Sequence, residues 1–149
     1  MSLDSSQPYA ASYVLLNKNG KNAFVLRGEG CGWMSGYYGL PSGKIDKNES
    51  ATVAATREVE EEVDVKIKQE KLRHVLTMHR HEKNDKYPEW VDFYFEADEW
   101  EGDVRNSEPH MHDELAWFSS DELPENIIPS VRAALEAIQN DENFTEYGF

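Results

Sequence analysis

Short apolar runs separated by turn residues fill the first two thirds of the chain. Residues 11–18 (ASYVLLNK) and 22–27 (NAFVLR) predict two strands, and Asn19 and Gly20 between them tolerate the positive φ of a tight hairpin turn. Glycines interrupt residues 28–36, which therefore predict a loop. Further strands are predicted at 37–40, within 65–80, at 90–97 and at 114–118.

Two segments have the periodicity of helices. In residues 51–63 the apolar side chains of Ala55, Val59 and Val63 recur at i, i+4 spacing and would pack on a sheet. Residues 129–138 begin with a proline, which is favoured in the first turn of a helix. The polar tail after residue 140 is expected to be loosely docked. Since strands dominate and the helices lie in the middle and near the end, this order favours an α/β chain of the α+β kind, with a mixed sheet packed between helices.

The length and the charge limit the function. A chain of 149 residues suggests a single domain over residues 1–149, since domains usually have about 100–200 residues. The formal net charge of −14 disfavours binding to nucleic-acid polymers or anionic membranes through a basic face. No apolar run approaches the roughly 20 residues of a membrane span. The single cysteine, Cys31, and a first segment without the features of a secretory signal predict a cytoplasmic protein.

Histidines offer a weaker metal hypothesis. His79 and His81 share one face of a predicted strand, and His110 and His112 have the same spacing. Two such pairs could meet at a metal. The sequence places no third type of ligand beside them, so we favour ordinary surface or strand roles for these histidines.

Residues 43–65 (GKIDKNESATVAATREVEEEVDV) carry the strongest chemical signal. At about 100° per residue, Glu58, Glu61 and Glu62 fall within an arc of about 100° on the predicted helix, whereas Glu60 lies nearly opposite. Crowded carboxylates repel one another unless a cation is present. Oxygen ligands without sulfur favour Mg²⁺, with Mn²⁺ or Ca²⁺ as substitutes. A solvated glutamate-rich face would explain the charge but not the position of Glu60.

Two residues flank this carboxylate cluster. Arg57 lies beside Glu58 and could fix its carboxylate in one rotamer through a charge-assisted pair. Glu49 precedes or begins the helix, where negative charge is favoured by the helix dipole, and its side chain could reach the same cluster.

The segment resembles the Nudix box, G-x5-E-x7-R-E-U-x-E-E-x-G-U, in which U is an aliphatic residue. Eight of the nine specified positions match over residues 43–65. The exception is Asp64, where the family has glycine. Aspartate is among the residues that most often adopt the left-handed conformation, so we expect the helix still to end there. The lead-in YGLPSG also resembles the family's aromatic-x-aliphatic-Pro-Gly-Gly, with Ser42 in place of one glycine.

The resemblance implies a Nudix-type α/β/α sandwich that hydrolyses a nucleoside diphosphate linked to a group X. By this resemblance Glu58 and Glu62 are the main Mg²⁺ ligands, and Glu61 is a third ligand or the general base. Glu49 would join through the metal or its waters, and Arg57 would orient Glu58. The full set implied for catalysis and metal binding is Ser42 (through its backbone carbonyl), Glu49, Arg57, Glu58, Glu61 and Glu62.

The resemblance defines the substrate less closely. Residues 100–118 look like the matching part of MutT-type pyrophosphatases, which implies a nucleoside triphosphate or a similar small nucleotide. Arg27 matches a position where relatives often have a basic residue facing the substrate, and Arg80 is a second candidate phosphate contact. A surface ion pair is the alternative for both arginines. Tyr38 could stack on a base or sugar, or belong to the core. The alternative function is that of a nucleotide-binding or regulatory protein without turnover. The sequence leaves open whether the chain forms a homodimer.

Overall fold

The computed structural model describes residues 4–83 and 85–149, and within them it contains eight strands and two α-helices. The strands are β1 (Tyr9–Lys18), β2 (Lys21–Arg27), β3 (Tyr38–Gly39), β4 (Ser42–Lys44), β5 (Arg73–His81), β6 (Glu89–Ala97), β7 (His112–Phe118) and β8 (Phe144–Tyr147). The helices are α1 (Ala51–Val63) and α2 (Pro129–Gln139), and short 3₁₀ turns lie at Glu29–Cys31 and Gln69–Lys71. None of the helices in this part of the chain is long and apolar enough to cross a membrane.

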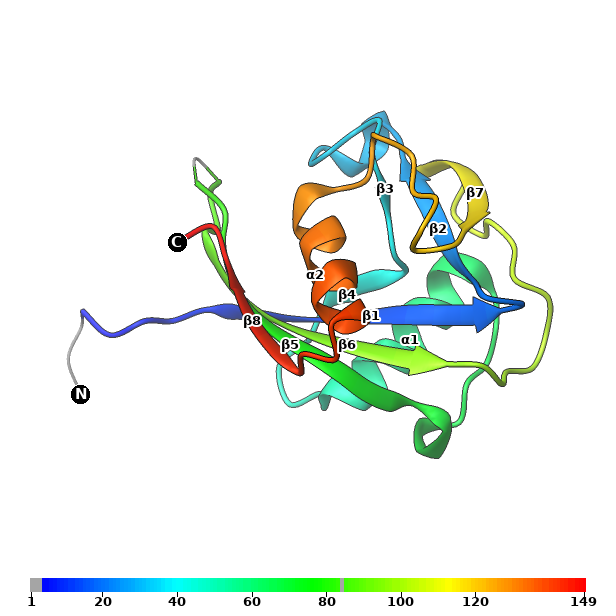
Figure 1. The fold of residues 1–149 in the computed structure, drawn as a ribbon, viewed down its shortest axis with the longest axis horizontal. Helices are drawn as coiled ribbons and strands as arrows, with labels where there is room; N and C mark the ends of the chain where they lie inside the picture. The colour runs from blue at the N-terminus through cyan, green and yellow to red at the C-terminus, as the bar shows by residue number, and fades with distance from the viewer. Residues whose placement is uncertain (1–3, 84) are drawn as a thin grey trace.

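The strands form a mixed sheet in the order β3-β2-β1-β6-β5-β8, with β4 paired to β1 and β7 paired to β2 (Figure 1). β1 runs parallel to β6, and β5 runs parallel to β8, whereas the other pairs are antiparallel. In the β1–β4 pair, Ser12 lies opposite Gly43. This register places the loop that precedes α1 against the middle of the sheet.

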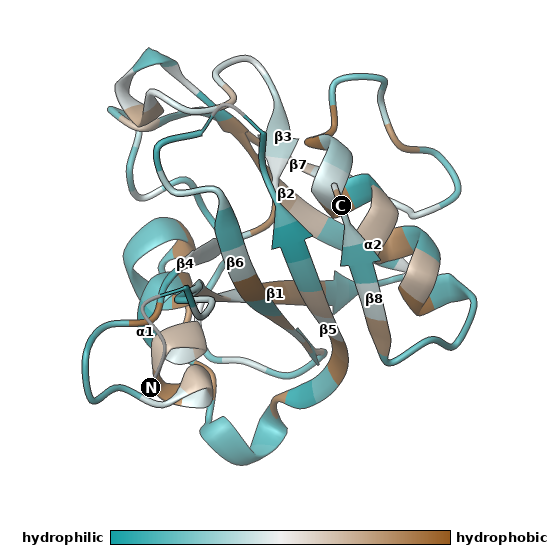
Figure 2. Ribbon diagram, turned by 90° about the vertical axis from the view of Figure 1, so that its left-hand side faces the viewer, coloured by the Kyte–Doolittle hydropathy of each residue, from teal (hydrophilic) through white to brown (hydrophobic). Residues whose placement is uncertain are grey.

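The two helices cover opposite faces of the sheet, as Figure 2 shows. Along β1 the side chains alternate between the two faces, so that Val14 and Leu16 pack in the α1 cluster while Tyr13 and Leu15 pack in the α2 cluster. The predicted architecture of a mixed sheet between helices is therefore confirmed.

Helix α1 begins and ends where its sequence predicts. The Ser50 side chain caps the first turn by accepting a hydrogen bond from the backbone N–H of Val53 at 3.2 Å. At the other end Asp64 adopts φ 60° and ψ 37°, and its N–H donates to the Glu60 carbonyl at 3.2 Å. The expectation that Asp64 takes over the left-handed position of the box glycine is confirmed. The Asp64 carboxylate turns to Arg105, with an Oδ2–Nε distance of 2.7 Å.

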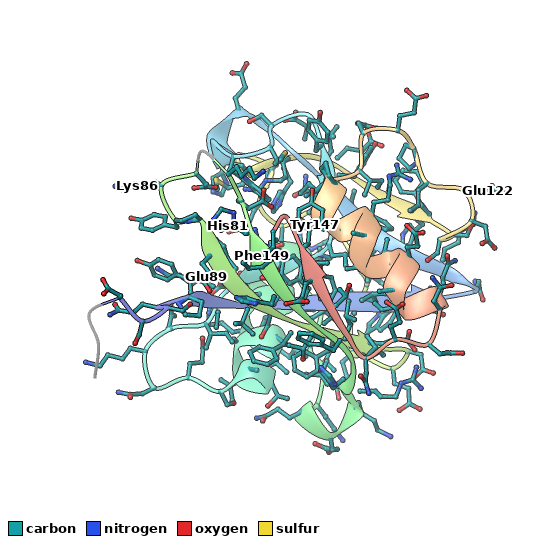
Figure 3. All side chains as sticks on the ribbon, turned by 60° about the vertical axis from the view of Figure 1, so that its left-hand side comes forward. His81, Lys86, Glu89, Glu122, Tyr147 and Phe149 are labelled. Carbon is teal, nitrogen blue, oxygen red and sulfur yellow. The ribbon has the colours of Figure 1, made fainter. Side chains whose placement is uncertain are left out.

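The expectation of a loosely docked tail is wrong. Residues Phe144–Tyr147 form β8, which pairs in parallel with β5 from Thr77 to Arg80. Beyond it the ring of Phe149 lies 5.5 Å from that of His81, and Figure 3 shows the two side chains at the same end of β5. β8 is a short edge strand with half of its side chains exposed. Its four residues therefore lack the run of apolar side chains from which a strand could be predicted.

Candidate active site

Helix α1 presents its carboxylates toward β4 and the turn before it. An added Cβ at Gly43 would lie 2.1 Å from the Glu58 carboxylate, so the absence of a side chain there makes room for this group. The backbone N–H of Ser42 lies 3.4 Å from Oε2 of Glu62, which is buried. Glu60 points into solvent and lies 4.0 Å from the Lys66 ammonium. The predicted separation of Glu60 from the other carboxylates is confirmed.

Arg57 joins three of the acidic side chains. Its Nε and Nη2 donate to both oxygens of Glu49, at 2.8 and 2.9 Å. Its Nη1 donates to Glu58 at 2.8 Å and lies 3.4 Å from Glu61. Glu49 also accepts the N–H of Asp46, and these bonds lower the pKa of Glu49 to about 2. Both Glu49 oxygens are thus engaged by Arg57, which joins Glu49 to Glu58.

The pKa values of Glu58 and Glu62 are both raised, which indicates that the surrounding protein does not fully stabilise their negative charge. Burial raises the pKa of Glu62 well above its ordinary value, and the neighbouring Glu58 raises it further. Burial also raises the pKa of Glu58, although the Arg57 guanidinium partly offsets this effect. Glu58 shares the Arg57 guanidinium with other carboxylates, and no ion pair to Glu62 is found in the described residues. A cation stabilises such a pair of neighbouring, desolvated carboxylates.

Glu108 is a functional candidate that sequence reasoning missed. Its charge raises the pKa of both Glu58 and Glu62, which indicates that it lies near them, in the segment before β7. Ser107 holds this segment against α1, because its N–H donates to the Glu62 carbonyl at 3.0 Å and its hydroxyl to the Glu61 carbonyl at 2.6 Å. No helical or strand periodicity links residue 108 to the box, so only the fold brings it there.

The donor set fits a hard divalent cation. Glu62, which is buried, and Glu58, which is partly buried, supply carboxylate oxygens at one place, and no thiol or imidazole is needed to complete the set. Within residues 4–83 and 85–149, no three acidic, histidine or cysteine side chains are arranged to hold an ion as they stand. Glu49 and Glu61 are instead paired with Arg57, at 2.8 and 3.4 Å. The Glu61 side chain is 51% exposed, so it is free to turn toward an ion.

A cavity of about 250 Å³ opens beside this cluster. Ser42 and Gly43 form its edge next to the carboxylates, and Trp33 and Trp90 are among its aromatic lining residues. Arg27 lies near it, because its Nε donates to the Trp33 carbonyl at 2.7 Å and its guanidinium carbon lies 5.4 Å from the centre of the Trp33 ring. The indole rings therefore give the cavity flat apolar walls, and the Arg27 guanidinium lies at one side.

Arg80 and Tyr38 are already engaged in the structure. Arg80 lines the cavity, but its guanidinium is buried and donates to both oxygens of Asp92, at 2.6 and 3.0 Å. It is a buried ion pair rather than the surface pair considered from the sequence. Tyr38 is buried beside Phe118 and donates its hydroxyl to Glu114 at 2.9 Å. Tyr38 does not line the cavity, so the structure favours its core role over the expected substrate contact.

The histidines do not converge. His79 lies 2.8 Å from Glu89 on β6, whereas His112 is buried on β7 opposite Arg27. No atom in the described residues makes a hydrogen bond to Nδ1 of His112. Burial and the charge of Arg27 lower the pKa of His112 to about 4, so its ring is neutral at pH 7. Cys31 donates its thiol to the Met111 carbonyl at 2.9 Å.

Comparisons with known proteins bear on the family and the fold. The family model of the NUDIX domain matches residues 6–138. Among solved structures, the chain is similar to a MutT NUDIX hydrolase from Burkholderia pseudomallei, with a TM-score of 0.76, 28% identity and coverage of 88% of this chain and 98% of that one. It also shares its fold with a MutT protein from Methanosarcina mazei, with a TM-score of 0.73, 22% identity and coverage of 94% and 98%. No curated protein matches the sequence.

Proposed function

The chain belongs to the Nudix family and is a hydrolase of phosphoric anhydride bonds, and from this premise we propose that it is a divalent-cation-dependent pyrophosphohydrolase of a small nucleotide. The most suitable substrate class is a nucleoside triphosphate or a similar molecule with one base. The observation that carries the proposal is the pair of Glu58 and Glu62 next to Ser42 and Gly43, since both carboxylates have raised pKa values and both backbone residues line a cavity with aromatic walls.

We assign Mg²⁺ as the preferred ion and Mn²⁺ as its substitute, held by Glu58 and Glu62 together with Glu61, Glu108 and the carbonyl of Ser42. Bound there, the ion would screen the phosphate charge and acidify a water molecule. Supporting this assignment, Glu62 is buried with only a weak bond from Ser42.

The remaining box residues hold the cluster in place. Arg57 fixes the Glu58 carboxylate at 2.8 Å, and the bidentate pair with Glu49 fixes Arg57 in turn. Glu61 and Glu108 are the candidates for the general base. Glu61 makes only one bond of 3.4 Å to Arg57, so its carboxylate is available to accept a proton from a water molecule.

The adjoining cavity is assigned to the nucleoside part of the substrate. Trp33 and Trp90 offer faces for stacking a planar base, and Arg27 offers a cation near the phosphates. Arg80 is assigned a positioning role, since its pair with Asp92 leaves its guanidinium between the two tryptophan rings, 6.0 Å from the centre of Trp33 and 5.1 Å from that of Trp90.

A nucleotide panel tests the proposal. Purified protein is incubated with nucleoside triphosphates, nucleoside diphosphate sugars and dinucleoside polyphosphates in Mg²⁺, Mn²⁺ or EDTA, and the products are separated by anion exchange. We expect cleavage of at least one class in Mg²⁺ and none in EDTA. Binding of a nucleotide by calorimetry without cleavage of any panel member would overturn hydrolysis and support the alternative of a nucleotide-binding protein.

A further inference from the structure

A second cavity lies at the other end of β1, away from the carboxylates. It has a volume of about 440 Å³ and is lined by residues of the β1–β2 hairpin, the loop after β6 and β7. Tyr13 lines the first cavity and Lys18 lines this one. At about 3.3 Å per residue, the two positions are about 17 Å apart along the strand. One mononucleotide cannot fill both cavities, so this one is a separate site.

Two lysines with no acidic partner mark one wall of this cavity. Lys18 and Lys21 are opposite each other in the register of the hairpin, so their side chains leave the same face of the sheet. Like charges at directly opposed positions destabilise a strand pair. The ion pairs of the described residues include Lys66–Glu60 and Lys71–Glu99 but none with Lys18 or Lys21. In a chain with 29 acidic and 15 basic residues, two lysines without an ion pair beside a cavity that has one acidic lining residue, Asp103, favour an anionic occupant.

Two tryptophans supply the apolar walls. Trp117 on β7 lies opposite Ala23 on β2. Lys21 comes two residues before Ala23 on the same strand, so all three side chains lie on one face of the sheet. Trp100 reaches this face from the loop after β6. Both indoles are only partly buried, which leaves large aromatic surfaces at the cavity.

The loop that closes the cavity is held in place by α1 and the chain after it. Glu101 and Lys66 exchange backbone hydrogen bonds of 3.0 and 2.9 Å. The N–H of Arg105 donates to the Val63 carbonyl at 3.0 Å. These bonds fix both sides of the loop, so the cavity is pre-formed, as small-molecule sites usually are.

We propose that this cavity is a second ligand site, for a small anion attached to a planar ring, such as a nucleoside monophosphate. The Lys18 and Lys21 ammonium groups bind the anion, and the ring packs on Trp100 and Trp117. Asp103, which also lines the cavity, disfavours a polyanion and accepts a hydrogen bond from an amino group on the ring. The inference does not depend on the proposed hydrolytic function.

The four tryptophans of the chain make a direct test possible by NMR of the indole N–H groups. Trp33 and Trp90 report on the first cavity, and Trp100 and Trp117 report on the second. The probe is AMP in EDTA, with adenosine and inorganic phosphate as partial probes. We expect AMP to shift the signals of Trp100 and Trp117, and each partial probe to bind more weakly than AMP.

A matched pair of variants separates this site from non-specific charge effects. Lys18→Gln with Lys21→Gln should weaken the AMP response of Trp100 and Trp117 by about tenfold or more, which corresponds to about 1.4 kcal/mol. The control, Lys47→Gln with Lys83→Gln, removes the same charge from exposed positions outside the cavity and should leave the response unchanged. The proposal is overturned if AMP leaves both signals unmoved, or if the two double variants respond alike.

Discussion

Replacing Gly43 with alanine is expected to displace the Glu58 carboxylate without unfolding the protein. The new Cβ would lie 2.1 Å from the carboxyl carbon and from one oxygen of Glu58, which is closer than atoms can approach. Gly43 has no positive φ, so the backbone accepts alanine. The atoms that must move are at the end of a flexible side chain. We therefore expect the Glu58 carboxylate to be displaced while the strand pairing of β4 with β1 is retained.

The expected magnitudes differ for stability and for activity. Displacement weakens the ion pair between Glu58 and Arg57, which is partly exposed and is worth about 1 kcal/mol or less in such settings. A catalytic group moved by about 1 Å costs on the order of a hundredfold in rate, or about 2.7 kcal/mol in the barrier. Gly43→Ala should thus lose less than about 1 kcal/mol of stability but about a hundredfold in kcat/KM.

The assay combines thermal unfolding with hydrolysis of the best nucleotide at several Mg²⁺ concentrations. Gly20→Ala is the matched control, because Gly20 has φ 77° in the β1–β2 turn and nothing within 4 Å of an added Cβ. This control should lose about 1 kcal/mol of stability through backbone strain and keep full activity. If Gly43→Ala keeps the wild-type kcat/KM and Mg²⁺ midpoint, the reasoning about Glu58 is refuted.

Three further predictions test the helix phase, its end and a buried histidine. Glu62→Gln should reduce kcat by several orders of magnitude, whereas Glu60→Gln should change it less than about threefold, as expected for a surface change; equal losses would contradict the assigned phase. Asp64→Gly should change unfolding free energy by less than about 1 kcal/mol, because relief of the left-handed strain offsets the lost Arg105 pair, and the Mg²⁺ midpoint should not move. Folding lowers the pKa of His112 to about 4. As the pH drops from about 6.5 to 4, the His112 ring is protonated in the unfolded chain but not in the folded chain, so the free energy of unfolding falls. In urea unfolding, His112→Gln should lose this part of the pH dependence, up to about 3 kcal/mol, and an unaltered pH profile would show that His112 does not titrate in this way.

The helices and the main strands could be predicted from the sequence because each carries a local signal. The apolar stripe of α1 lies between Ser50, which caps its first turn, and Asp64, which takes the left-handed position after its last turn, and the structure has the predicted bounds, Ala51–Val63. β4 and β8 carry no such signal. Ser42–Lys44 contains no apolar side chain, and Phe144–Tyr147 alternates exposed and partly buried side chains over only four residues, which is too short to distinguish from a loop. Both become strands because a neighbouring strand offers free backbone groups.

The candidate site was predictable only where its residues lie close together in the sequence. The box carries its own spacing, so the shared face of Glu58 and Glu62 follows from helical geometry. Glu108 enters the same cluster through bonds between Ser107 and the last turn of α1, and such long-range contacts leave no periodic trace. Similarly, the residue type of Arg80 suggests a phosphate contact, but its partner Asp92 comes from the neighbouring strand β6.

The most direct test of the central claim is the cation dependence of hydrolysis in the wild-type chain and in Glu62→Gln. Both proteins are titrated with Mg²⁺ against the best nucleotide of the panel, with circular dichroism to confirm that the variant is folded. The account predicts saturable Mg²⁺-dependent cleavage by the wild type, abolished by EDTA, and a folded variant with cleavage reduced by several orders of magnitude. Hydrolysis that proceeds equally in EDTA, or that survives Glu62→Gln at the wild-type rate, would contradict it.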